Sequence, residues 1–252
     1  MIKERDMMGG LAKGLKIIEA FSADRPRLSI SEASEQTGLD RATARRCLLT
    51  LAELGYAAHD GKFFTLTPRI LRLGTTCLAT MPLPRIVQPV LDQLSQQIGQ
   101  STSVSILDET EIVYVARATQ TRVMSISLMP GSRLPAYCTS MGRVLLASLR
   151  PDEQRAILAT SDRIARTQYT KTDINELLAE LEKVHEQGYS QIDQEVEMGL
   201  RSIAVPVITM HNKTIAALNT GLAASVASNA EIIDRYLPAL LKVQSDLKQM
   251  LA

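Results

Sequence analysis

The stretch "LSISEASEQTGLDRATARRCLLTLAELGY" carries two helix start signals in close succession, and this pattern constrains the fold more than any other feature of the chain. Ser29 and Glu32 form an S-x-x-E capping box, which begins a short helix that ends at Gly38. Asp40 is placed to cap a second helix, which runs to Gly55. Two helices joined by so short a turn predict a helix-turn-helix.

The segments on either side extend this motif. Before it, "LAKGLKIIEAF" places Leu11, Leu15 and Ile18 on one side of a helix. After it, "YAAHDGKFFTLTP" contains two short β-prone runs around Asp60-Gly61, a strong signal for a hairpin with a two-residue turn. Three helices and a hairpin predict a winged helix-turn-helix of about 60 residues.

The second helix of the pair has two distinct faces at about 100° per residue. Ala44, Leu48 and Leu51 fall on the side that faces the core, whereas the arginines cluster on the outer side of its first half. A recognition helix needs this arrangement, because its first turns enter the major groove of DNA. A solvated basic helix end would show the same charges, but the preceding capped helix and the wing favour DNA binding. The predicted DNA contacts are Arg41, Ala42, Thr43, Arg45, Arg46 and, in the wing, Lys62.

Charge is distributed in agreement with that interpretation. Residues 1–80 carry 12 Lys or Arg against 9 Asp or Glu, whereas residues 81–252 carry 16 against 18. A basic first part and a slightly acidic remainder fit a chain whose first part alone meets a polyanion.

A second, longer region follows the proline-containing segment "MPLP". Its pattern predicts helices near 85–99, 141–149, 151–159, 172–187 and 229–251, and strands at 101–107, 111–118, 123–131, 202–208 and 214–222. We therefore expect an α+β fold in which helices cover an antiparallel sheet. The predicted domains are a winged helix-turn-helix at 9–68, a linker helix at 69–84 and a sensor domain at 85–252.

The segment "GSRLPAYCTSMGR" is the best candidate for a ligand site in that region. It leads into a helix near Ser140, where free N–H groups would hold a small carboxylate through the amides of Ser140 and Met141. An ordinary strand-to-helix turn capped by Ser140 has the same sequence features, so both interpretations stay open. Arg133, Arg143 and Arg201 are candidate partners for the carboxylate, because a guanidinium binds it with two hydrogen bonds.

Other classes of protein find little support. Cys47, Cys77 and Cys138 stand far apart with no histidine at metal spacing, so we predict free, buried thiols, no metal and no cofactor. No apolar run reaches about 18 residues, and "MIKERDMMGG" lacks the apolar part of a secretory signal. The expected location is the cytoplasm, with no membrane partner.

Beyond these patterns, the chain resembles the IclR family of bacterial transcriptional regulators. The resemblance covers residues 10–250 and is carried by the helix-turn-helix and hairpin, by "PGSRLPAYCTSMGRVLLASL", by "EQGYSQIDQEVEMGLRSIAVPV" and by "TIAALNTGL". "AYCTSMGRVLLA" resembles in particular the subgroup that controls the catabolism of aromatic acids and β-ketoadipate. The resemblance implies a GAF-like effector domain after the linker helix.

It also implies an effector pocket at defined positions. Polar contacts fall on Ser140, Met141, Asp193, Ser202 and Asn219, and apolar lining falls on Ile126, Leu134 and Leu200. This chain has Ser202 where the family often has Cys, and Asn219 where it often has Ser. These departures affect the identity of the ligand rather than the presence of the pocket.

We therefore expect a ligand-responsive transcription regulator that binds a palindromic operator in double-stranded DNA as a homodimer or homotetramer, with a small organic acid as effector and RNA polymerase as a further partner. Two alternatives remain at this stage. The C-terminal region would be a metabolic enzyme if Asp193, Glu195 and Glu197 formed an acid–base site, although no G-x-S-x-G motif or triad order is present and we predict no catalytic residue. The winged domain would bind protein if it did not bind DNA.

Overall fold

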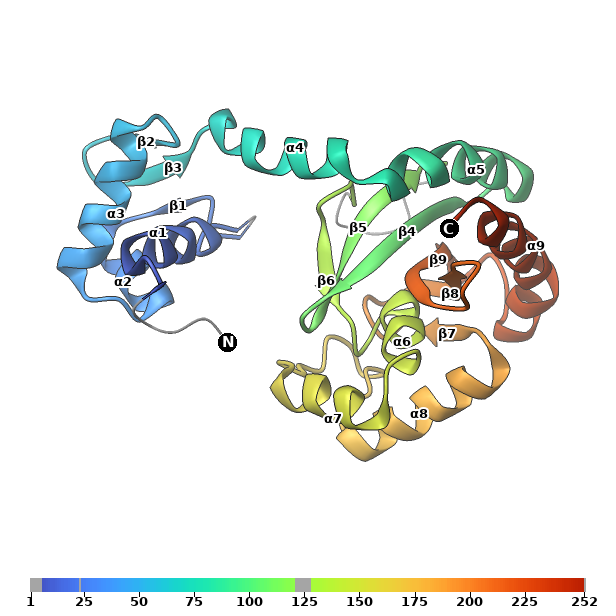
Figure 1. Cartoon of the computed structure of the whole chain (residues 1–252). Helices are drawn as coiled ribbons and strands as arrows, with labels where there is room; N and C mark the ends of the chain where they lie inside the picture. The colour runs from blue at the N-terminus through green and yellow to red at the C-terminus, as the bar shows by residue number, and fades with distance from the viewer. Residues whose placement is uncertain (1–5, 23, 121–127, 252) are drawn as a thin grey trace. The chain divides into compact units, whose positions relative to one another are not determined.

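The computed structural model of the chain describes residues 6–22, 24–120 and 128–251 and divides into two compact units, Met1–Thr80 and Met81–Ala252 (Figure 1). The N-terminal unit has one buried apolar core, and the C-terminal unit has two, one on each face of its sheet. Within the described ranges, no helix combines the length and the apolar character that crossing a membrane requires.

The N-terminal unit is a three-helix winged fold. The capping box of Ser29 and Glu32 forms as predicted, and Gly38 ends the helix with a φ of 67°, a conformation that glycine adopts without strain. The Asp40 side chain accepts a 2.8 Å hydrogen bond from the Thr43 N–H and so begins the next helix. The elements are α1 (Gly9–Glu19), β1 (Arg27–Leu28), α2 (Ile30–Thr37), α3 (Arg41–Glu53), β2 (Ala57–His59), β3 (Phe64–Leu66), the short 3₁₀ segment η2 (Pro68–Ile70) and α4 (Leu71–Thr80).

Three local details differ from the sequence prediction. The wing has a third strand, β1, which pairs with β3 to give the order β1-β3-β2. The hairpin turn spans four residues, because the Asp60 carboxylate accepts hydrogen bonds from the N–H groups of Lys62 and Phe63 and stabilises a longer loop. On α1, Ile17 is buried in the core while Leu11 is 61% exposed.

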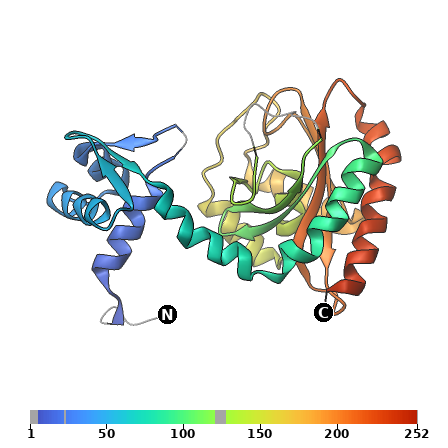
Figure 2. The same ribbon diagram turned by 90° about the horizontal axis from the view of Figure 1, so that it is seen from above.

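The C-terminal unit is built on one antiparallel sheet of six strands in the order β6-β5-β4-β9-β8-β7. Two helices, α5 and α9, cover one face, and α6 and α8 cover the other (Figure 2). Its elements are α5 (Pro82–Ile98), β4 (Ser101–Asp108), β5 (Glu111–Ala118), β6 (Arg133–Pro135), α6 (Ser140–Ala147), α7 (Pro151–Thr160), α8 (Ile174–Gln187), β7 (Ser190–Asp193), β8 (Leu200–Ile208), β9 (Thr214–Ala223) and α9 (Asn229–Met250). The expected helix-covered antiparallel sheet is therefore confirmed.

Two strands of this sheet differ from the prediction. The strand expected at 123–131 falls mostly outside the described residues, and the chain pairs with β5 at 133–135 instead. A short strand at 190–193 was not anticipated; it pairs with β8 at the edge of the sheet. Of the three thiols, Cys138 is buried as predicted, whereas Cys77 is exposed on α4.

Candidate effector pocket and nucleic-acid interface

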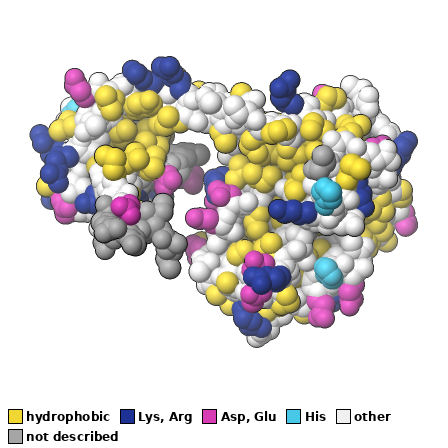
Figure 3. All heavy atoms as spheres, in the orientation of Figure 1, with side chains coloured by type: hydrophobic (Ala, Val, Ile, Leu, Met, Phe, Trp, Pro, Cys, Tyr) yellow, Lys and Arg dark blue, Asp and Glu magenta, His cyan; other side chains and the backbone are white. Residues whose placement is uncertain are grey.

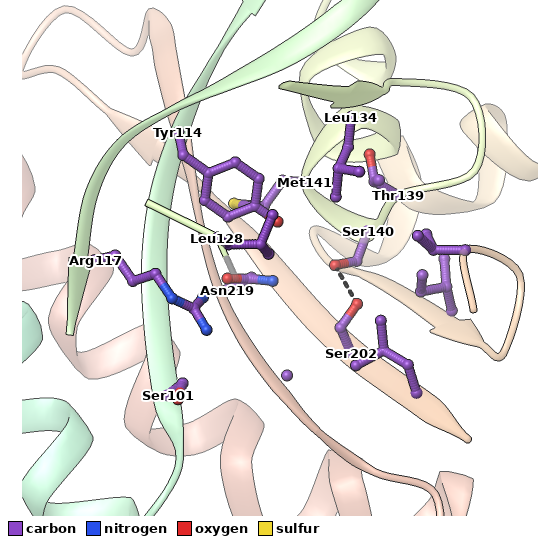
Figure 4. A pocket seen from close by; sticks show the side chains of 14 residues that line it. Ser101, Tyr114, Arg117, Leu128, Leu134, Thr139, Ser140, Met141, Ser202 and Asn219 are labelled. Atoms are coloured by element: carbon purple, nitrogen blue, oxygen red, sulfur yellow. Dashed lines mark hydrogen bonds between the residues drawn. The ribbon is translucent and has the colours of Figure 1, made fainter. Parts of the chain in front are cut away.

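A cavity lies between the sheet and the first turn of α6, inside the second apolar core of the C-terminal unit (Figure 4). Its volume is about 40 Å³, well below the about 300–1,000 Å³ of typical small-molecule sites, so an aromatic acid would have to displace lining side chains to enter it. We call it the sheet cavity. Its lining residues are Ser101, Tyr114, Arg117, Leu128, Leu134, Thr139, Ser140, Met141, Ile192, Val196, Leu200, Ser202, Asn219 and Gly221.

A β-bulge shapes one wall of this cavity. Val104 pairs with Ala116 and Ser105 pairs with Tyr114, so Val115 is an extra residue in β5. Side chains alternate between the two faces of a strand, and one extra residue reverses that alternation. For this reason Tyr114 and Arg117, which are three positions apart, both line the sheet cavity.

Arg117 is the unusual side chain of this wall. Its Nη1 donates a 2.7 Å hydrogen bond to Ser103 Oγ, while its Nε is buried without a hydrogen-bond partner. Gln88 of α5 fixes its backbone, because the side-chain amide accepts from the Arg117 N–H and donates to the Arg117 carbonyl. Burial lowers the pKa of Arg117, but a guanidinium stays protonated at neutral pH. Within the described residues no carboxylate forms a salt bridge with it.

Each of the three arginines predicted to bind the ligand's carboxylate forms a salt bridge with a carboxylate of this same chain. Arg133 contacts Asp108 and Glu111 on the surface. Arg201 forms two hydrogen bonds with Asp193, its cross-strand partner. None of these arginines lines the sheet cavity.

Arg143 forms the third of these pairs, and it is buried. Its Nη1 and Nη2 lie 2.7 and 2.5 Å from the two carboxylate oxygens of Glu195. Its Nε donates to the carbonyl of Tyr137, and the Lys171 N–H donates to the same carboxylate of Glu195. This carboxylate therefore links α6 to two loops and does not serve as part of an acid–base pair.

The turn before α6 brings its first residues to the cavity. The N-cap is Thr139, not Ser140, and its Oγ1 accepts from the Gly142 N–H. Gly142 packs against the backbone of Ala136 so closely that a Cβ atom would overlap it, which explains the glycine. Ser140 is thereby free to face the cavity, where it shares a 2.7 Å hydrogen bond with Ser202 of β8.

Most of the ligand positions implied by the family resemblance lie together. Six of them line the sheet cavity: Leu134, Ser140, Met141, Leu200, Ser202 and Asn219. Ile126 lies outside the described residues. Asp193 does not line the cavity, because its neighbour Ile192 occupies the cavity face of β7 and Asp193 faces the opposite way, toward Arg201 and Asn229.

Two more polar side chains face the cavity without a hydrogen bond to any described residue. Asn219 is 9% exposed and its amide lies in the cavity (Figure 4). Tyr114 is also buried, and this burial raises the pKa of its phenol to about 12, so the hydroxyl is neutral and can donate or accept. Sequence reasoning missed Tyr114 and Arg117; the one signal was an arginine inside the largely apolar strand "EIVYVARA".

In the N-terminal unit, α3 exposes the basic end that the sequence predicted. Ala42, Arg45 and Arg46 are exposed, and dark blue side chains lie at the edge of this unit where α3 runs (Figure 3). Arg41 is also exposed and donates a 2.7 Å hydrogen bond to Ser31 of α2. Arg46 donates to Thr43 Oγ1 at 3.2 Å, which orients its guanidinium along the helix.

The prediction that Thr43 faces outward is wrong. Thr43 is 6% exposed, because α1 packs across this side of α3. The groove between the two helices is lined by Gly10, Lys13, Gly14, Thr43, Arg46, Cys47, Thr50 and Leu51. Thr43 therefore supports Arg46 from behind and does not present its own side chain.

The wing carries two cations on one aromatic ring. Lys62 Nζ lies 5.0 Å from the centre of the Phe63 ring, and the guanidinium carbon of Arg27 lies 4.5 Å from it. Such cation–π contacts hold both charges near the wing without neutralising them. Arg27 was not among the predicted DNA contacts, because β1 gave no strand signal of its own.

The helix-turn-helix domain of IclR matches residues 10–61, and the family described as bacterial transcriptional regulator IclR, C-terminal, matches residues 75–249. The chain belongs to the IclR family. Its two regions are thus the DNA-binding domain and the effector-binding domain of a transcription regulator. The expected fold class is confirmed, and nothing in these matches favours an enzyme.

Individual relatives of this IclR-family chain are regulators too. The Pca regulon regulatory protein of Pseudomonas putida is 42% identical over 96% of this chain and 84% of its own length. A transcriptional regulator from Rhodococcus sp. RHA1 is 43% identical, with a TM-score of 0.78 over 97% of this chain and 98% of that one. The inducer-binding domain of a PobR double mutant from Acinetobacter, in complex with 3-hydroxybenzoic acid, is 33% identical with a TM-score of 0.63 and covers 68% of this chain and 100% of that one.

Proposed function

We propose that this IclR-family regulator controls the catabolism of an aromatic or other small organic acid and that the acid itself is the effector bound in the sheet cavity. The observation that carries the proposal is the partly buried guanidinium of Arg117, which lines a cavity of mixed polar and apolar side chains and has no carboxylate partner among the described residues. A buried cation without a counter-ion is costly, so a site that keeps one favours an anionic ligand.

The names of the relatives agree with this chemistry. The Pseudomonas protein is named for a pca regulon, and the Acinetobacter domain is bound to 3-hydroxybenzoic acid. Leu134, Met141 and Leu200 line the cavity and would contact the apolar body of such an acid, whereas Ser140, Ser202 and Asn219 would contact its polar groups. Met141 also accepts a hydrogen bond from Ser105, which leaves its methyl end for the ligand.

On DNA, α3 would enter the major groove and present Arg45 and Arg46 to bases or phosphates beside the small Ala42. Arg41 would contact a phosphate at the start of the helix, and Lys62 of the wing would contact the backbone. Two copies in a homodimer or homotetramer would bind a palindromic operator whose half-sites are separated by whole helical turns. RNA polymerase would be a further partner in the cytoplasm.

Regulation follows from linkage between the two units. An effector can change DNA affinity only by its difference in affinity for the DNA-competent and DNA-incompetent arrangements. Residues 71–98 connect the units as α4 and α5, and Gln88 of α5 holds the backbone of Arg117. The effector site therefore adjoins the segment that leads to the DNA-binding domain.

A thermal-shift screen of organic acids against the full-length protein tests the effector. We expect stabilisation by aromatic carboxylates, because a ligand at about 100 times its dissociation constant adds about 2.7 kcal/mol to the stability. Each hit is then added to the protein on an operator selected from random-sequence DNA, and its effect on DNA affinity is measured by fluorescence anisotropy. Hits that stabilise the protein but leave DNA affinity unchanged would contradict the regulatory role.

A further inference from the structure

The polar groups of the sheet cavity are not distributed evenly. Arg117 lies on β5, and the Ser140–Ser202 hydroxyl pair lies across the cavity on the β8 side (Figure 4). Strand pairing orders them: Arg117 pairs with Ser103, Ser103 pairs with Asn219, and β8 is the next strand. Strands are about 4.8 Å apart, and the Arg117 guanidinium reaches Ser103 on β4, so the cavity has a cationic end near β4 and a neutral, hydroxyl-lined end at β8, about two strand spacings away.

At the cationic end, Arg117 is ready to bind an anion. Nη1 is used by Ser103, but neither Nε nor Nη2 has a hydrogen bond to any described residue. Nη2 would meet a ligand in the cavity first, and a small rotation of the guanidinium would bring Nε to the second oxygen of a carboxylate. Such paired N–H···O contacts are the strongest that a side chain offers a carboxylate.

At the other end, every group is neutral. Ser140 and Ser202 already share a hydrogen bond, yet each hydroxyl can make a second one. Asn219 lies between the two ends and offers both a donor and an acceptor. No cation besides Arg117 lines the described part of the cavity, so a second carboxylate would lose its hydration without a counter-ion there.

From this arrangement we infer that the effector is a hydroxylated monocarboxylic acid bound with its carboxylate at Arg117 and its hydroxyl at Asn219 and the Ser140–Ser202 pair. This orientation is the reverse of the one that the sequence suggested, in which the amides of Ser140 and Met141 hold the carboxylate. The inference rests on the proposed function, since it assigns the parts of the same effector.

Isothermal titration calorimetry of the full-length protein tests this orientation with four probes: 4-hydroxybenzoate, benzoate, 4-hydroxybenzamide and adipate. In wild type we expect 4-hydroxybenzoate to bind more tightly than the other three. In Arg117→Gln, the affinity for 4-hydroxybenzoate should fall at least tenfold, because hydrogen bonds to charged groups are lost, while the affinity for the uncharged amide should change less than threefold. Arg133→Gln is the control, since it removes an arginine that is paired on the surface.

Two more variants separate the ends of the cavity. Ser202→Ala should lower the affinity for 4-hydroxybenzoate about threefold to tenfold and leave the affinity for benzoate unchanged. Arg117→Lys keeps the charge but not the paired geometry, so it should bind 4-hydroxybenzoate with an affinity between those of wild type and Arg117→Gln. Circular dichroism melts establish that each variant is folded before titration.

Several results would overturn the inference. If Arg117→Gln lost affinity for 4-hydroxybenzoate and for 4-hydroxybenzamide by the same factor, Arg117 would not be the partner of the carboxylate. The proposed function would still stand. If Ser202→Ala lost as much affinity for benzoate as for 4-hydroxybenzoate, the ligand's hydroxyl would not bind at the Ser140–Ser202 pair. Adipate that binds as tightly as 4-hydroxybenzoate would contradict the single carboxylate. A wild-type protein that binds no acid at all would contradict the proposed function, and the inference with it.

Discussion

The arginines of the N-terminal unit differ from three arginines of the C-terminal unit in whether they pair with a carboxylate. Within the described residues 13–22 and 24–72, no Lys or Arg side chain forms a salt bridge. In the C-terminal unit, by contrast, Arg133, Arg143 and Arg201 each have a carboxylate partner. The first group is open to a polyanion, whereas the second stabilises loops and strand edges.

Arg117 differs from these three arginines, because it has no carboxylate partner among the described residues and its buried Nε has no hydrogen bond. Pairing with a carboxylate, rather than the mere presence of an arginine, therefore separates Arg133, Arg143 and Arg201 from the arginines that are open to a ligand. The number of arginines in a segment says nothing about this, since "GSRLPAYCTSMGR" has two and both are paired within the protein.

The largest effect on stability is expected at the buried ion pair of Arg143 and Glu195. Glu195→Gln leaves the charge of Arg143 buried without its partner, and we expect a loss of about 3–5 kcal/mol in the free energy of unfolding, measured by urea denaturation. Replacing both residues by leucine should cost less than the sum of the two single changes, because no unpaired charge remains. The exposed Glu186→Gln serves as the control and should stay within about 0.5 kcal/mol of wild type. A loss below about 1 kcal/mol in Glu195→Gln would show that this pair is not structural.

The next largest effect is on DNA affinity and concerns the arginines of α3, which have no carboxylate partner among the described residues. Arg46→Ala should reduce the affinity for a selected operator by about 10- to 100-fold, which corresponds to about 1–3 kcal/mol for one base-contacting arginine, and should leave folding and effector binding intact. Anisotropy titrations measure this change, with Lys16→Ala as the control because it removes an exposed cation from α1. Unchanged operator affinity in Arg46→Ala would show that α3 is not the recognition helix.

The smallest effect concerns Asp193, whose pair with Arg201 is partly exposed. The hydrogen bonds from Arg201 hold the pKa of Asp193 below its ordinary value of 3.8. A lowered carboxyl pKa stabilises the fold above pH 4, and this stabilisation is lost as the pH falls through the pKa in the folded state. Asp193→Asn should therefore be less stable than wild type by about 1 kcal/mol at pH 7, and the difference should shrink below pH 4.

Urea denaturation at pH 7 and pH 3 measures this difference. The exposed Asp246→Asn, which removes a carboxylate without a salt bridge in the described structure, should equal wild type at both values. A deficit in Asp193→Asn that persists unchanged at pH 3 would assign the effect to packing.

Local signals in the sequence determined the two helices of the helix-turn-helix and the turn between them. The capping box at Ser29, the N-cap at Asp40 and the glycine turn at Gly38 act over a few residues, so their outcome does not depend on distant contacts. The family resemblance likewise located six lining residues of the sheet cavity, because they lie in segments that the chain shares with its relatives.

Tertiary structure alone decided the rest. Thr43 is buried because α1 crosses it, and the angular position of a residue on its own helix cannot reveal a neighbouring helix. The sequence contains Arg117, yet simple alternation would place it on the face of β5 opposite to Tyr114. The bulge at Val115 reverses that alternation through pairing with β4, and only the paired sheet turns Arg117 toward the cavity.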